Sequence, residues 1–159
     1  MQLPIAINDI KGFLHPDEGA ALFQHVLTTA ALGPCLEVGS YCGKSTIYLG
    51  TAAKSAGGIV YAVDHHRGSE EHQLGEEYHD PDLFDPAAHL MDSFREFRKN
   101  IRAADLESAV VPIVAPSTVA ALHWATPLGM VFIDGGHSWE AALNDYRSWV
   151  AHIRPGGIL

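Results

Sequence analysis

The residues Glu37-Val-Gly-Ser-Tyr-Cys-Gly-Lys-Ser-Thr form the segment of the sequence best suited to holding a small ligand. A carboxylate, Glu37, is followed by Gly39 and Gly43, and then by residues that begin a helix. Gly39 has no side chain, so its backbone can approach a ligand that any other residue would block. The first N–H groups of the helix behind Gly43 are unpaired, and the helix dipole is positive there. The segment predicts a ligand-binding turn between a strand and a helix.

A second carboxylate, Asp64, ends the next apolar run of the sequence. At that position it could accept both hydrogen bonds of a ribose diol. A dinucleotide loop would need the spacing G-x-G-x-x-G, but Tyr41 occupies the second glycine position. The large Tyr41 side chain and the nearby Glu37 disfavour a pyrophosphate, whereas an acid suits the cationic methionine end of S-adenosylmethionine (SAM). The pattern predicts a nucleoside ligand without a pyrophosphate.

A third group of reactive residues follows the run Met130-Val-Phe-Ile. The pair Gly135-Gly136 lets the chain turn sharply and aim Asp134 and His137 at one spot. His137 has three open interpretations: a general base, a metal ligand, or a turn residue that hydrogen-bonds to the backbone. If it is a base, Asp134 beside it is the group that orients the imidazole.

Short apolar runs separated by helical patterns must position these residues. Near-continuous apolar runs are typical of strands buried on both faces, and they lie at residues 35–38, 59–63, 110–114 and 130–133. Helices are expected over 15–31, 44–56 and 89–104, and after a capping Ser138 with Leu143 and Tyr146 inward. The alternation predicts an α/β fold with an open, mostly parallel, doubly wound Rossmann-like sheet and right-handed crossovers.

Two segments depart from this alternation. Residues 65–86 are rich in acids and histidines and are expected to form a solvated loop or a lid. The chain stops at Pro155-Gly-Gly-Ile-Leu, just as a fifth strand begins, so we expect residues 1–159 to be a single domain, with a cofactor-binding core over 35–159, that lacks its C-terminal strands. An exposed strand edge of that kind also predicts a homodimer.

Charge and composition exclude some partners. The formal net charge is −9, with 10 Lys and Arg against 19 Asp and Glu, which argues against binding to nucleic acid or to an anionic membrane surface. No apolar run is long enough to span a bilayer. Cys35 and Cys42 make neither a disulfide framework nor a metal motif. A cytoplasmic location is expected.

Taken together, these motifs resemble the class I SAM-dependent methyltransferases, in particular a small O-methyltransferase-like group with the signature I-D-G-x-H-x-x-E. The matching residues are Glu37 to Gly43, Asp64, Asp134 to His137, and Pro155-Gly156-Gly157. Gly12-Phe-Leu also resembles the segment that folds over the methionine end of the cofactor in this group. The resemblance implies a class I methyltransferase fold and SAM as the cofactor.

The resemblance also implies roles for individual residues. The backbone at Gly39 would hold the methionine, Asp64 the ribose, and Ser117 would lie near the adenine, while Asp134 and His137 would face the methyl group. The full set of expected cofactor residues is Gly12, Phe13, Glu37, Gly39, Ser40, Tyr41, Gly43, Ser45, Asp64, His65, Ser117, Asp134 and Gly135. Related metal-dependent enzymes keep a Mg²⁺ ligand at the position of Asp134, so a Mg²⁺ site is implied there.

The expected reaction is methyl transfer to a hydroxyl oxygen of a small molecule. An aliphatic hydroxyl is too weak an acid to lose its proton unaided, so a general base or a divalent cation must help. A saccharide is the first candidate acceptor and a catechol-like phenol the second. Two other classes stay open: a cofactor-binding module without catalysis, which binding without turnover would indicate, and an NAD-dependent oxidoreductase, which Tyr41 disfavours.

Overall fold

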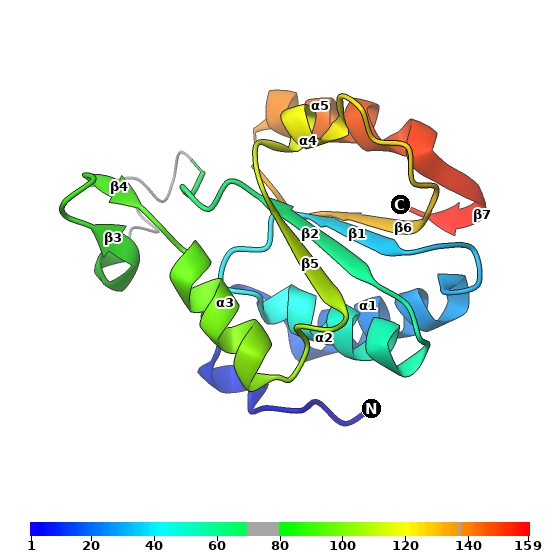
Figure 1. Ribbon diagram of the computed structural model, residues 1–159, viewed down its shortest axis with the longest axis horizontal. Helices are drawn as coiled ribbons and strands as arrows, with labels where there is room; N and C mark the ends of the chain where they lie inside the picture. Colours follow the sequence, from blue (N-terminus) through cyan, green and yellow to red (C-terminus); the bar gives the residue numbers. More distant parts are fainter. Residues whose placement is uncertain (70–79, 137) are drawn as a thin grey trace.

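The computed structural model describes residues 1–69, 80–136 and 138–159 and contains a central parallel sheet (Figure 1). Its strand order is β5-β2-β1-β6-β7, and every neighbouring pair runs parallel. The strands are β1 (Cys35–Val38), β2 (Val60–Asp64), β5 (Val110–Val114), β6 (Leu128–Ile133) and β7 (Ile153–Ile158). All four predicted strands are present, and the fifth also forms.

Helices cover both faces of this sheet (Figure 1). One face carries α1 (Pro16–Thr29), α2 (Lys44–Ser55) and α3 (Phe94–Ala103), and the other carries α4 (Ser117–Ala121) and α5 (Trp139–Trp149). The predicted doubly wound α/β architecture is therefore confirmed. None of the helices in the described parts of the chain combines the length and the apolar content needed to cross a membrane.

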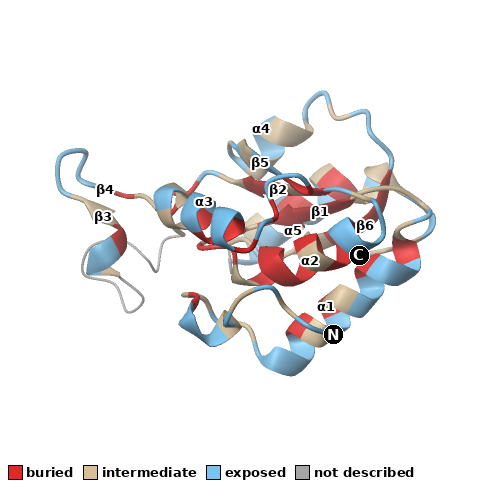
Figure 2. Cartoon of the chain, turned by 60° about the horizontal axis from the view of Figure 1, so that its bottom comes forward, coloured by how far each residue is buried: buried red, intermediate tan, exposed pale blue. Residues whose placement is uncertain are grey.

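The two faces of β1 show how the strand sequence divides the core. Cys35 packs with α1 and α2, whereas Leu36 and Val38 pack with Trp149 of α5. Successive side chains of a strand point to opposite faces, so a strand covered on both sides is apolar throughout. Figure 2 shows the result, with buried residues concentrated in the strands and on the inner sides of the helices. Glu37 is the one charged residue of β1, and it is also fully buried.

The structure corrects the expected helix over residues 89–104. α3 begins only at Phe94, and Leu90–Met91 instead form β4, which pairs antiparallel with β3 (Phe84–Asp85). The side chain of Asp92 accepts the N–H of Phe94 at 3.0 Å, which satisfies a donor that has no partner inside the helix. His89 has a φ of 51°. The apolar residues before Phe94 fit a helical spacing, but they do not belong to the helix.

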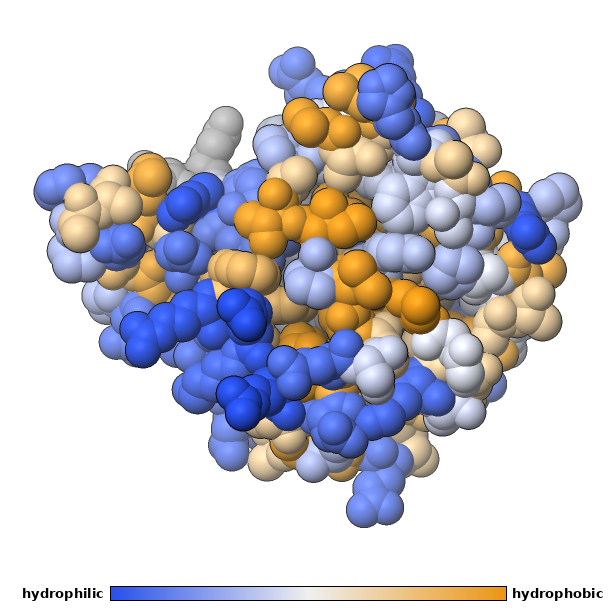
Figure 3. All heavy atoms as spheres, in the orientation of Figure 1, coloured by the Kyte–Doolittle hydropathy of each residue, from blue (hydrophilic) through white to orange (hydrophobic). Residues whose placement is uncertain are grey.

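One edge of the sheet is formed by β5, over which apolar side chains gather in the middle of the face in Figure 3, and the other by β7. Val111 and Val114 are 40% and 52% exposed. The C=O of Ala109 and the N–H of Ala115 bond to β2, so by alternation Pro112 faces the open edge. Proline removes a donor there, which hinders pairing with another strand.

The acidic segment expected over 65–86 is described only in part, since residues 70–79 lie outside the described residues. Within the described part, Pro81–Leu83 form a 3₁₀ turn before β3. Leu83 is buried and packs with Cys42 and Met91. The C-terminal end of the segment is therefore packed on the domain, and the choice between a loop and a lid stays a prediction for the remainder.

Candidate active site

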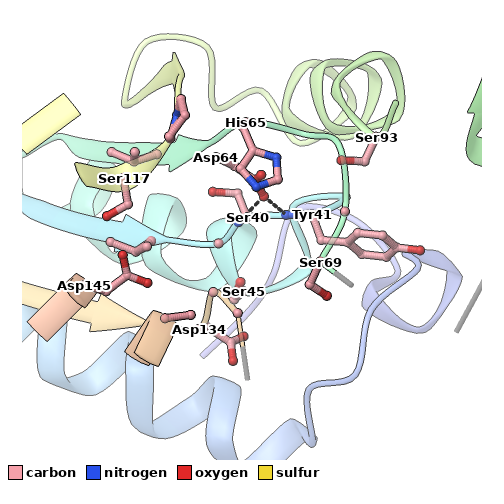
Figure 4. Close-up of a pocket in the computed structure, with 18 of the residues that line it drawn as sticks. Ser40, Tyr41, Ser45, Asp64, His65, Ser69, Ser93, Ser117, Asp134 and Asp145 are labelled. Atoms are coloured by element: carbon pink, nitrogen blue, oxygen red, sulfur yellow. Dashed lines mark hydrogen bonds between the residues drawn. The ribbon is translucent and has the colours of Figure 1, made fainter. Parts of the chain in front are cut away.

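A cavity of about 570 Å³ lies at the carboxyl ends of the parallel strands (Figure 4). Open α/β sheets bind their ligands at this edge, and the volume is in the usual range for small-molecule sites. Most of the residues expected to bind a cofactor line it: Gly12, Phe13, Gly39, Ser40, Tyr41, Ser45, Asp64, His65, Ser117, Asp134 and Gly135. Glu37 and Gly43 are not among the residues that line it, and His137 lies outside the described residues.

The turn between β1 and α2 forms one wall of the cavity. It begins with a strand-like bond from the N–H of Gly39 to the C=O of Val63, at 2.9 Å. Gly43 precedes α2 in the left-handed region, with a φ of 90°. A Cβ at Gly43 would lie 3.2 Å from the ring of Phe97. Gly43 therefore serves the packing of α2 against α3. It was expected to bind the cofactor, but it does not line the cavity.

Gly39 makes a close approach, but to the protein itself. Its φ is 88°, and a Cβ there would lie 2.6 Å from the carbonyl carbon of Asp134 and 2.8 Å from the Cα of Gly135. It would also collide with the carbonyl oxygen of Asp134. The missing side chain thus brings the ends of β1 and β6 together. Since Gly39 also lines the cavity, the two segments that meet at this point share one wall.

The carboxylate of Asp64 holds the turn from the end of β2 (dashed lines in Figure 4). One oxygen, Oδ2, accepts the backbone N–H groups of Ser40 and Tyr41, both at 2.8 Å. The other, Oδ1, accepts the N–H of His66 at 2.7 Å. A carboxylate has about four lone-pair sites, so roughly one is left for a ligand. The structure therefore differs from the expectation that Asp64 offers two acceptor sites to a ribose.

Glu37 lies beneath the cavity. It is fully buried, and its carboxylate accepts hydrogen bonds from the hydroxyls of Ser45, at 2.5 Å, and Thr46, both in the first turn of α2. Burial raises the pKa of Glu37 to about 7, although the bonds from these hydroxyls lower it, and the charge of Asp134 raises it further. Ser45 lines the cavity, and its hydrogen bond to Glu37 fixes the position of its hydroxyl in the wall.

The N-terminal segment contributes Gly12 and Phe13 to the lining of the cavity. The ammonium group of Lys44 donates to the C=O of Gly12 at 3.0 Å, which ties this segment to the start of α2. Lys11 pairs with Asp80 at 2.6 Å and with Asp82 at 2.9 Å. Sequence analysis missed both lysines, which line the cavity. Both are far from residues 65–86 in the sequence, so no local pattern indicated their position.

Asp134 follows β6 and enters the cavity beside Gly135. Its backbone N–H donates to the C=O of Val38 at 2.8 Å, which fixes it next to the turn after β1. In the described ranges, no three His, Cys, Asp or Glu side chains are grouped to hold a metal ion. Asp134 alone offers too few ligands for Mg²⁺, which prefers octahedral oxygen coordination. The described residues around Asp134 therefore do not fit a Mg²⁺ site.

A carboxylate that sequence analysis did not single out, Asp145, completes the site. It lines the cavity from α5; burial raises the pKa of its carboxyl group, and the hydroxyl of Ser117 opposes that rise. Asp145 and Trp149 are the buried residues of α5, whereas Tyr146, expected to face inward, is 44% exposed. The inward face of α5 thus carries an acid. Asp145 lies four residues before Trp149 and therefore on the same face of the helix. A search for apolar residues alone does not find it, because Asp145 is charged.

Among the solved structures that share this fold are three methyltransferases, each longer than the chain. An O-methyltransferase from Bacillus cereus in complex with SAH has a TM-score of 0.66 and 21% identity, and the match covers 95% of this chain and 59% of that one. An O-methyltransferase from Streptomyces achromogenes involved in tomaymycin synthesis, in complex with SAM, has a TM-score of 0.60 and 15% identity, with 92% and 55% covered. An SAH-bound methyltransferase from Podospora anserina has a TM-score of 0.63 and 11% identity, with 92% and 52% covered.

The family model described as "Methyltransferase domain" matches residues 36–159. The match includes Glu37, Asp64 and the segment after β6. The chain therefore belongs to the methyltransferase domain family, as its motifs indicated. It spans between half and two thirds of the length of these three structures.

Proposed function

We propose that this protein binds SAM in the cavity at the sheet edge and transfers its methyl group to a hydroxyl oxygen of a small molecule. The observation that carries the proposal is the convergence of the Gly39–Tyr41 turn, Asp64, Ser117 and Asp134 on one cavity in a chain of the methyltransferase domain family. SAM and SAH in the related structures support the choice of cofactor.

The arrangement of the cavity suggests how the cofactor lies. Its ribose would use the remaining lone pair of Asp64, because carboxylates at this strand end bind ribose hydroxyls in related folds. Its methionine end would lie toward Gly12 and Phe13, and its base toward Ser117. The methyl group would then face Asp134.

For the chemical step, the bound cofactor supplies an electrophilic methyl group. His137 takes the proton of the acceptor hydroxyl, and Asp134 orients the imidazole. Transfer of that methyl group to the acceptor oxygen would leave the electron pair of the carbon–sulfur bond on sulfur and give SAH and a methylated acceptor. Walls that exclude water and hold the acceptor in line contribute through positioning. A saccharide hydroxyl is the proposed acceptor.

Binding and turnover are measured separately to test the proposal. Calorimetry should show that SAH binds, and mass spectrometry of a saccharide panel with SAM should show products heavier by one methyl group. His137→Gln should lower the single-turnover rate about a hundredfold or more while SAH affinity is kept. His123→Gln, an exposed histidine away from the cavity, is the matched control and should leave both unchanged.

The other outcomes separate the remaining hypotheses. SAH binding without any methylated product would favour a binding module without catalysis. Absence of SAH binding would overturn the proposal altogether. Normal turnover by His137→Gln would leave the cofactor assignment standing and remove His137 from the chemistry.

A further inference from the structure

The carboxylate of Asp145 is a feature of the cavity that the proposed reaction does not use. The residue is 8% exposed, yet it lines the cavity from α5. Burial raises the pKa of Asp145, and the nearby hydroxyl of Ser117 opposes that rise. A carboxylate has about four lone-pair sites, so a single donor leaves most of its acceptor capacity to the cavity. Buried acceptors of this kind normally have partners, and a bound ligand is one source of them.

The position of Asp145 is fixed by its neighbours. Indole Nε1 of Trp149, one turn further along α5, donates to the hydroxyl oxygen of Ser117 at 2.7 Å, which leaves the hydrogen of that hydroxyl for another acceptor. On the other side, Oδ2 of Asp145 lies 3.1 Å from the point that a Cβ of Gly135 would occupy. The carboxylate is thus held between the start of α4 and the end of β6.

The order of the strands places this carboxylate at the base end of a nucleoside. Along the sheet edge the turn after β1 is followed by Asp64 on β2 and then by Ser117 after β5. In Figure 4, Ser117 and Asp145 lie on one side of the cavity, and Tyr41 lies on the other, with Asp64 and Ser40 between them. A ribose at Asp64 with its methionine end toward Gly12 therefore leaves the base on the side of Ser117.

We propose that Asp145 accepts a hydrogen bond from the 6-amino group of the cofactor's adenine and so selects an aminopurine over an oxopurine. The inference rests on the proposed function, because it assumes that a nucleoside cofactor occupies the cavity. An amino group is a donor and matches an ionised carboxylate, which only accepts. A 6-oxo group would bring its oxygen against the carboxylate, and the bond would be lost.

The test compares SAH with S-inosylhomocysteine, which carries a 6-oxo group in place of the 6-amino group. Wild-type protein should bind SAH about 10- to 100-fold more tightly, the range expected for one hydrogen bond to a charged acceptor. Asp145→Asn keeps the shape and can donate to the 6-oxo group, so the preference should fall at least tenfold. Ser117→Ala, which removes the orienting donor, should reduce it severalfold.

Asp64→Asn is the matched control, with the same chemical change in the same cavity. It should weaken both ligands by a similar factor and leave their ratio unchanged. Equal affinities of the wild-type protein for the two ligands would overturn the inference while the proposed function stands. An unchanged ratio in a folded Asp145→Asn variant would also overturn it. If the wild-type protein binds neither ligand, the proposed function fails first and the inference with it.

Discussion

The carboxylate of Asp64 accepts the backbone N–H of Tyr41 at 2.8 Å, and Tyr41 has a φ of 46°. A tyrosine in the left-handed region costs about 1–2 kcal/mol. The bond from β2 holds that strained conformation in place, and the same oxygen also accepts the N–H of Ser40. A residue that is expected to bind a ribose therefore also builds the wall next to it.

This double role predicts the effect of Asp64→Ala. The variant loses a ligand acceptor and releases the turn, so SAH affinity should fall tenfold or more and the melting temperature should fall as well. Asp64→Asn keeps one acceptor oxygen for the turn and should lose affinity with a smaller change in melting temperature. Calorimetry and thermal unfolding measure the two effects. Unchanged SAH affinity in Asp64→Ala would show that Asp64 does not contact the cofactor.

Gly39→Ala should destabilise the fold itself. The substitution combines a left-handed φ with a clash against the backbone of Asp134 and Gly135, and we expect a loss of roughly 2–5 kcal/mol in the free energy of unfolding. Gly57→Ala is the matched control, since Gly57 has a φ of 70° but nothing within 4 Å of its Cβ position. It should lose only about 1–2 kcal/mol. Equal losses in denaturant titrations would mean that the clash is relieved.

Glu37 should make stability depend on pH. Its pKa is raised from 4.5 to about 7 by burial, so between these values the folded state binds more protons than the unfolded state. The free energy of unfolding should therefore fall as pH rises through this window, by up to about 3 kcal/mol from this one group. Glu37→Gln has no proton to lose and should flatten the slope from pH 5 to 8. A slope that is the same in both proteins would contradict the assignment.

His66 should act in the opposite direction. It is buried against Phe94 and Phe97, its Nδ1 lies 2.9 Å from the hydroxyl of Ser93, and burial lowers its pKa below the ordinary value of 6.5. The unfolded state then takes up a proton first as pH falls below 6.5, so the folded state loses stability on acidification. Proton titration of the ring by NMR checks the pKa. His25→Gln, at an exposed position of α1, is the control. It should leave the loss of unfolding free energy below pH 6.5 unchanged.

The sequence alone predicted the strands of the central sheet and the helices α1, α2 and α5, but not β3, β4 or α4. The strand β1 and the turn at Gly39 can be predicted because an apolar run and a glycine turn are local patterns. The placement of Asp64 and Asp134 at one edge follows as well, since parallel strands bring their carboxyl ends together. The start of α3 could not be predicted from local patterns. Leu90 and Met91 fit a helical spacing but pair with β3 instead.

Only the tertiary structure decided what the polar residues contact. Glu37 and Gly39 lie two positions apart, yet one points beneath α2 to Ser45 and the other packs on the backbone of Asp134. Asp145 and Ser117 line the same cavity because α4 and α5, which carry them, pack together. Hydrogen bonds and steric contacts of this kind join distant segments, and their partners are fixed by the packing of the helices on the sheet, which no local spacing encodes.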